Sequence, residues 1–94
     1  MGLKLFINKV FYYLGEMKTR PNRTLDCLGL FCPEPVYRTR IELDKMKLGE
    51  ILEVVADDPA ADADIQSLVK RLGHELLDVS KKGNEIRILI KKSK

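Results

Sequence analysis

The sequence predicts an α+β fold, a two-layer α/β sandwich with element order βαβαββ, in which a four-stranded mixed sheet carries two helices on one face. Three observations lead to this prediction. Two segments have apolar residues at helical spacing, and four shorter segments are either apolar throughout or alternate between apolar and polar residues. Along the chain these segments follow the order strand, helix, strand, helix, strand, strand. With 94 residues, 45% of them hydrophobic, the chain is long enough for one core but not for two. Each helical stripe is apolar on one face only, so both helices should cover the same side of the sheet.

The first half of the domain contains a strand, a turn and a helix. Residues 24–28 alternate loosely and predict a short strand, and residues 29–32 a turn. A helix should begin at Pro33 to Pro35, because a first helical turn tolerates residues that lack an N–H. We expect it to end at Gly49 and to bury one face, which holds Val36, Leu43 and Met46, with Tyr37 and Ile41 beside it.

The second half contains a strand, a helix and a hairpin. Residues 51–56 are almost continuously apolar, which is typical of a central strand. Asp58 is a good N-cap with Pro59 at the first helical position, and Gly73 should stop this helix. Its predicted buried stripe comprises Ala61, Ile65, Leu68, Val69 and Leu72. Residues 77–79 and 86–90 alternate around a turn at 82–84, which predicts an antiparallel hairpin.

We divide the chain into residues 1–23, an N-terminal amphipathic extension and linker, and residues 24–94, the domain. The extension has apolar residues at helical spacing and carries five Lys and Arg against one Glu. It could pack on the domain, a partner or a membrane surface, or translation could start at Met17. We expect no secretory signal, since Lys9 interrupts the apolar run, and no transmembrane segment. Residues 24–94 are close to neutral, which argues against strong nucleic-acid binding by the core.

Cys32 is the residue most suited to chemistry, because it comes just before a predicted helix. Free N–H groups and the positive end of the helix dipole favour a thiolate, so we expect a lowered Cys32 pKa. A thiolate is the nucleophilic form and could accept and pass on a sulfur atom. The alternative is a thiol that only caps the helix.

Other candidate residues have simpler structural interpretations. Cys27 should be a core or half-buried strand residue, although it could also be a resolving thiol that pairs with Cys32. Asp57 and Asp58 are assigned to helix capping, and His74 to a capping or surface position. Arg38 and Arg40 could attract an anionic partner near Cys32 or lie on a solvated helix face. We expect no metal site, because one His and two Cys cannot form a closed four-ligand centre.

The segment around Cys32 resembles the TusA/SirA-like small sulfur-carrier proteins. The resemblance rests on Asp26, Gly29-Leu30 and Cys32-Pro33-Glu34-Pro35. It continues through Gly49-Glu50, Asp57-Asp58-Pro59, Asp64-Ile65 and Gly73-His74, and covers about residues 24–92. The Cys-Pro-x-Pro element is specific in this context.

The resemblance implies a cytoplasmic sulfurtransferase with Cys32 as its catalytic residue and without a cofactor. A cysteine desulfurase, a rhodanese or a similar donor would load a persulfide on Cys32, and an acceptor protein would take the sulfur. The destinations that it implies are tRNA thiolation, molybdenum-cofactor maturation and sulfur metabolism. Two other interpretations stay open, a non-enzymatic interaction module and a redox pair of Cys27 and Cys32.

Overall fold

The computed structural model describes residues 20–94, so the expectations for the extension at residues 1–19 lie outside the described part of the chain. The elements follow the predicted order, βαβαββ. They are β1 (Arg23–Cys27), α2 (Glu34–Lys45), β2 (Ile51–Ala56), α3 (Pro59–Leu72), β3 (Glu75–Lys82) and β4 (Glu85–Lys91). No helix among these residues is long and apolar enough to span a membrane.

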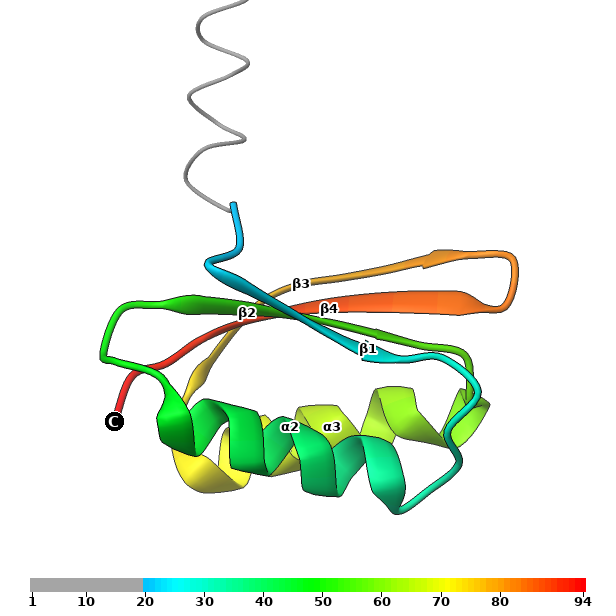
Figure 1. Ribbon diagram of the computed structural model, residues 1–94, viewed down its shortest axis with the longest axis horizontal. Coiled ribbons are helices and arrows are strands. Elements are labelled where there is room, and N and C mark those ends of the chain that lie inside the picture. Colours follow the sequence, from blue (N-terminus) through cyan, green and yellow to red (C-terminus); the bar gives the residue numbers. More distant parts are fainter. Residues whose placement is uncertain (1–19) are drawn as a thin grey trace, which may run out of the picture.

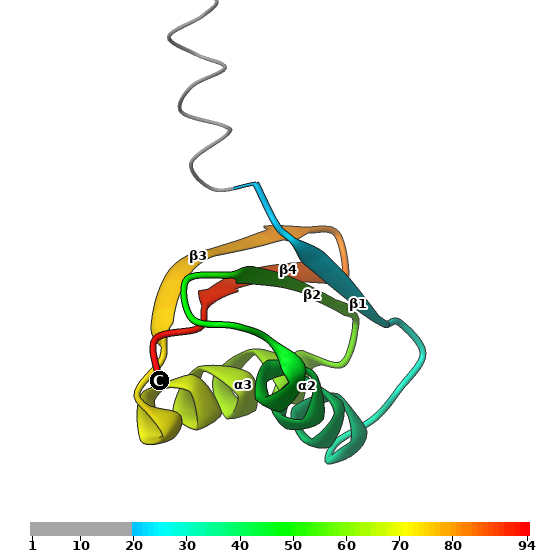
Figure 2. The same cartoon turned by 60° about the vertical axis from the view of Figure 1, so that its left-hand side comes forward.

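The four strands form one mixed sheet in the order β1-β2-β4-β3. β1 and β2 are parallel, whereas β4 runs antiparallel to both of its neighbours, β2 and β3. Figures 1 and 2 show α2 and α3 side by side on one face of this sheet. The predicted two-layer fold is therefore confirmed, and so is the central place of β2, which lies between β1 and β4.

The core fills the space between the helices and the sheet. Alternate residues of β4 belong to this core, which is the period expected of a strand with one covered face, whereas β2 is buried at all of its residues except Glu53. The predicted α3 stripe is buried except for Leu72, which is partly buried. The fully enclosed side chains include Leu43, Leu52, Val54, Ile65, Ile88 and Ile90.

Helix α2 differs from the prediction in its end and in its buried face. It ends at Lys45, because Met46 is already extended, and Gly49 lies in the turn before β2 with a φ of 88°. Its buried residues are Pro35, Thr39 and Leu43, whereas Tyr37 is exposed. Thr39 is tolerated in the core because its hydroxyl donates to the Pro35 carbonyl at 2.7 Å.

Both ends of α3 are as predicted. The Asp58 side chain accepts a hydrogen bond from the Ala60 N–H, and Gly73 adopts the left-handed conformation with a φ of 81°. The β3–β4 hairpin is also confirmed, although β3 begins earlier, at Glu75, and contains an irregularity between Leu76 and Asp78. The Asp58 cap lies at the start of α3, where its carboxylate also contacts the loop after β1.

Candidate functional site

Cys32 lies in the loop that connects β1 to α2. β1 and β2 are parallel neighbours, so this loop and the β2–α3 connection both follow the carboxyl ends of their strands, at the same end of the sheet (Figure 1). In open α/β sheets, ligands gather outside the carboxyl ends of the strands. Cys32 is exposed, directly before Pro33, the N-cap residue of α2, and the peptide bond between them is cis.

Two adjacent carboxylates hold the Cys32 loop against the start of α3. The Gly29 N–H donates to Asp57 Oδ1 at 2.9 Å, and the Cys32 N–H donates to Asp58 Oδ2 at 2.8 Å. Asp58 Oδ1 accepts from the Ala60 N–H at 3.1 Å, so one carboxylate caps α3 and also positions the cysteine. The expectation that this acidic pair serves helix capping is therefore incomplete.

The Cys32 thiol is in contact with a third carboxylate, from within α3. Its Sγ lies 3.1 Å from Asp64 Oδ2, in a geometry in which the thiol donates to the carboxylate. This hydrogen bond raises the pKa of Cys32, and desolvation and the negative charges of Asp64 and Asp58 raise that pKa further. These interactions all favour the neutral thiol over the thiolate.

The expected lowering of the Cys32 pKa is wrong, and the hydrogen bonds of the loop explain why. Pro33 and Pro35 have no N–H to offer. The Cys32 N–H is bound to Asp58, and the Glu34 N–H donates to the Phe31 carbonyl at 2.9 Å. The N–H groups nearest the sulfur are thus absent or already used, while full negative charges lie beside it.

Cys27 lies at the end of β1, fully enclosed in the core. This agrees with the expected core position. Burial raises the pKa of the Cys27 thiol, which disfavours the thiolate. Both cysteines are free, and they differ in environment, because Cys27 is buried whereas Cys32 is exposed.

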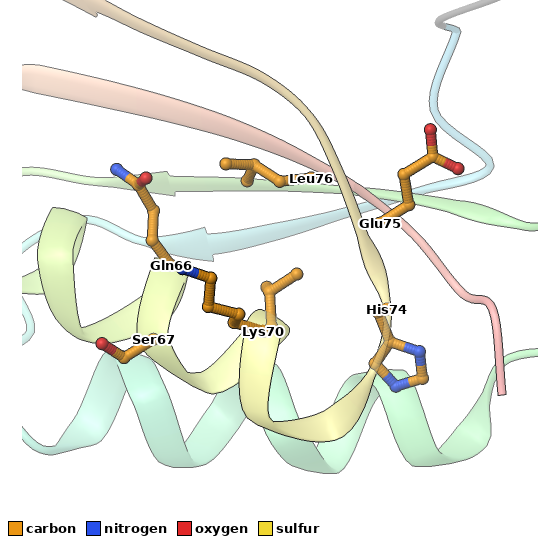
Figure 3. Close-up of a pocket in the computed structure, with 7 residues that line it drawn as sticks. Gln66, Ser67, Lys70, His74, Glu75 and Leu76 are labelled. Atoms are coloured by element: carbon orange, nitrogen blue, oxygen red, sulfur yellow. The ribbon is translucent and has the colours of Figure 1, made fainter.

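His74 and Arg38 do not join the cysteine site. His74 follows Gly73 at the far end of α3, where it lines a cavity of about 510 Å³ together with Lys70 and Leu76 (Figure 3). Its Nδ1 accepts from the Ser93 N–H at 3.1 Å, which links the start of β3 to the segment after β4, and desolvation lowers the His74 pKa. Arg38 is exposed and pairs with Glu34 one turn earlier at 3.4 Å.

The surface around the thiol is apolar as well as acidic. Phe31, directly before Cys32, is 72% exposed, and Leu28 at the start of the loop is also exposed. Exposed apolar side chains at a loop tip are typical of contact with another protein. Within residues 20–94, no group of three or more His, Cys, Asp or Glu could hold a metal ion.

Sequence reasoning missed Asp64 as a part of the site, although this residue belongs to the Asp64-Ile65 element of the resemblance. Asp64 is 32 positions from Cys32 and the two meet only in the fold. The feature that could have indicated this contact is the parallel pairing of the first two strands. This pairing brings the N-terminal ends of both helices to the same end of the sheet.

Comparison with known proteins identifies the family. The family model described as sulfurtransferase TusA matches residues 23–92. A protein of Archaeoglobus fulgidus named "Putative sulfur carrier protein" is 52% identical over 59 residues, 63% of this chain and 77% of that protein. The crystal structure of a SirA-like protein from Desulfitobacterium hafniense superposes with a TM-score of 0.68 at 25% identity, over 77% of this chain and 99% of that one. These matches support a sulfur-carrier role in general, and the chain belongs to the sulfurtransferase TusA family.

Proposed function

We propose that this protein is a sulfur carrier that takes up sulfur as a persulfide on Cys32 and relays it to an acceptor protein. The observation that carries the proposal is the exposed Cys32 sulfur at a loop tip that two carboxylates hold in place. The family match and the sulfur-carrier relative support the same chemistry. The donor would be a cysteine desulfurase, a rhodanese or a similar protein.

Sulfur transfer at this site requires a nucleophilic sulfur and a partner, but no metal or organic cofactor. The Cys32 sulfur attacks the terminal sulfur of the donor persulfide and displaces the donor thiol. Specificity would come from docking around the loop, where Phe31 and Leu28 offer apolar contacts and Asp58 and Asp64 offer negative charge. A partner with a basic rim and an apolar pocket suits this surface.

The acceptor would belong to tRNA thiolation, molybdenum-cofactor maturation or sulfur metabolism. Domain 24–94 would perform the transfer without residues 1–23. A cytoplasmic location suits two free cysteines, because that compartment keeps thiols reduced.

The test is intact mass spectrometry of the full chain after incubation with a cysteine desulfurase and cysteine. We expect a gain of one sulfur atom that a reductant removes and that peptide mapping assigns to Cys32. Cys32→Ser should show no gain, while Cys27→Ser, the matched control in the core, should load like the unmodified protein. Loading that persists in Cys32→Ser would overturn the proposal.

The raised Cys32 pKa favours one second candidate, an interaction module in which Cys32 serves only to position the loop. A thiol that stays protonated reacts slowly at neutral pH. The module predicts no sulfur uptake from any persulfide donor, and binding to a partner that Cys32→Ser leaves unchanged.

A further inference from the structure

The contact between Asp64 and the Cys32 sulfur exists in one chemical state of the carrier. In the thiol form, Sγ carries a proton and donates a hydrogen bond to Asp64 Oδ2, which lies 3.1 Å from the sulfur. When Sγ is bonded to a second sulfur it has no proton, so it can no longer donate this hydrogen bond. The unloaded carrier therefore has a favourable interaction that the loaded carrier lacks.

The charges around the sulfur act in the same direction. Asp58 and Asp64 face it from the start and the second turn of α3. On the α2 side, Glu34 and Arg38 pair with each other and so largely cancel. A persulfide is more acidic than a thiol, and its anion would place negative charge beside the two carboxylates of α3.

Asp64 is available for this role. Among residues 20–94 its carboxylate has no hydrogen-bond or ion-pair partner other than Cys32. Asp62, two positions earlier on α3, is different, because it binds Gln66 at 2.5 Å and Lys81 at 3.2 Å. The two residues therefore form a matched pair, because Asp64 binds the Cys32 sulfur whereas Asp62 binds Gln66 and Lys81.

We propose that Asp64 biases the carrier toward release of sulfur, by stabilising Cys32 as a thiol relative to Cys32 as a persulfide. This inference rests on the proposed function and deepens it. A carrier must give up its sulfur as well as accept it, and a site that disfavours the loaded state lowers the free-energy cost of release. Asp64 touches the reacting sulfur, whereas Asp58 is a positioning residue that holds the backbone of Cys32.

The reaction balances without an external oxidant. In loading, the S–S bond of the donor persulfide breaks, and a new bond forms between the donor's terminal sulfur and Cys32 Sγ. The inner sulfur of the donor keeps the electron pair of the broken bond and takes up a proton, while Cys32 Sγ loses its proton. Release is the same reaction with the acceptor as nucleophile, and the Cys32 sulfur regains a proton and the contact with Asp64. Asp64 acts on this equilibrium and not on the rate of either step.

The experiment compares the full-length protein with its Asp64→Asn and Asp62→Asn variants. Each is equilibrated anaerobically at pH 7 with glutathione persulfide and glutathione at fixed ratios, and the loaded fraction is measured by intact mass spectrometry. We expect the equilibrium constant for loading to rise about fivefold in Asp64→Asn, the effect of removing one partly exposed charge. Asp62→Asn should leave it unchanged. Asp64→Ser, a second neutral variant, tests the same point if Asp64→Asn does not fold.

A second readout uses the thiol alone and requires no sulfur transfer. The rate of alkylation of Cys32 by iodoacetamide is followed against pH, and its midpoint should shift to lower pH in Asp64→Asn but not in Asp62→Asn. If the unmodified protein loads normally and Asp64→Asn has the same loading equilibrium, the role proposed for Asp64 is overturned, while the proposed function stands. Failure of the unmodified protein to load from any donor would overturn the proposed function and this inference with it.

Discussion

The Cys32 backbone N–H donates to Asp58 Oδ2 at 2.8 Å, so the residue that caps α3 also positions the reactive loop in front of α2. The other oxygen of the same carboxylate binds the Ala60 N–H. A single side chain thus ties the geometry of the site to the stability of a helix, although the cysteine and its support lie 26 positions apart in the chain.

Substitutions at Asp58 should separate these two roles. Asp58→Ala removes both hydrogen bonds and should lower the free energy of unfolding by about 1–2 kcal/mol, measured by urea denaturation. Asp58→Ser keeps a short oxygen for the cap, so its stability should be close to that of the unmodified protein. Because one hydroxyl is too short to reach Cys32 as well, Asp58→Ser should still slow sulfur loading from a desulfurase. Equal loading rates for Asp58→Ser and the unmodified protein would contradict the positioning role.

Phe31 should matter for protein partners and not for small reagents. Phe31→Ser removes the most exposed apolar side chain beside the thiol and should reduce loading from a cysteine desulfurase by roughly 10-fold or more, as expected for an interface anchor. Loading from glutathione persulfide should not change, because that donor needs no docking surface. The matched control is Leu48→Ser, since Leu48 is 68% exposed but lies in the turn after α2. The same loss in both variants would refute a specific role for Phe31.

Cys32 in the folded protein should become reactive at a higher pH than an ordinary exposed cysteine. Its raised pKa means that the folded protein retains the thiol proton at a pH where an ordinary exposed cysteine has lost it. Alkylation of the native protein should therefore reach half its maximal rate at a higher pH than alkylation of an unfolded peptide with the same residues. The corresponding stability is present below the pKa of the unfolded chain and is lost as the pH rises through the folded pKa. A midpoint below that of the peptide would show that the helix dipole dominates after all.

The two cysteines should differ in their reaction with thiol reagents. A thiol reagent added to the native protein at mildly alkaline pH should modify Cys32 and leave Cys27 unmodified, because Cys27 is fully enclosed in the core. Both should react in guanidinium chloride. Mild oxidation of the native protein should leave Cys27 and Cys32 unlinked. A rapidly formed intramolecular disulfide, detected as a loss of two hydrogens by mass spectrometry, would instead favour the redox pair.

Sequence patterns predicted the element order, the single helical layer and both ends of α3, because these features depend on local periodicity and on capping residues. Asp58, Pro59 and Gly73 have strong positional preferences that need no knowledge of the rest of the fold. The end of α2 was less predictable. Met46 has the polarity of a helical core residue, but it packs in the core from an extended backbone.

The residue that we propose as reactive was also predicted from the sequence, through Cys32 and the prolines that follow it. The direction of its pKa shift was not. The local pattern of a cysteine before a helix predicts a lowered pKa, whereas the fold raises that pKa by bringing Asp64 and Asp58 to the sulfur. Electrostatic interactions act through space, and the distance between these groups is set by the parallel pairing of β1 and β2. Local patterns were enough to propose Cys32 as the reactive residue, whereas the charges beside its sulfur depend on the pairing of distant strands.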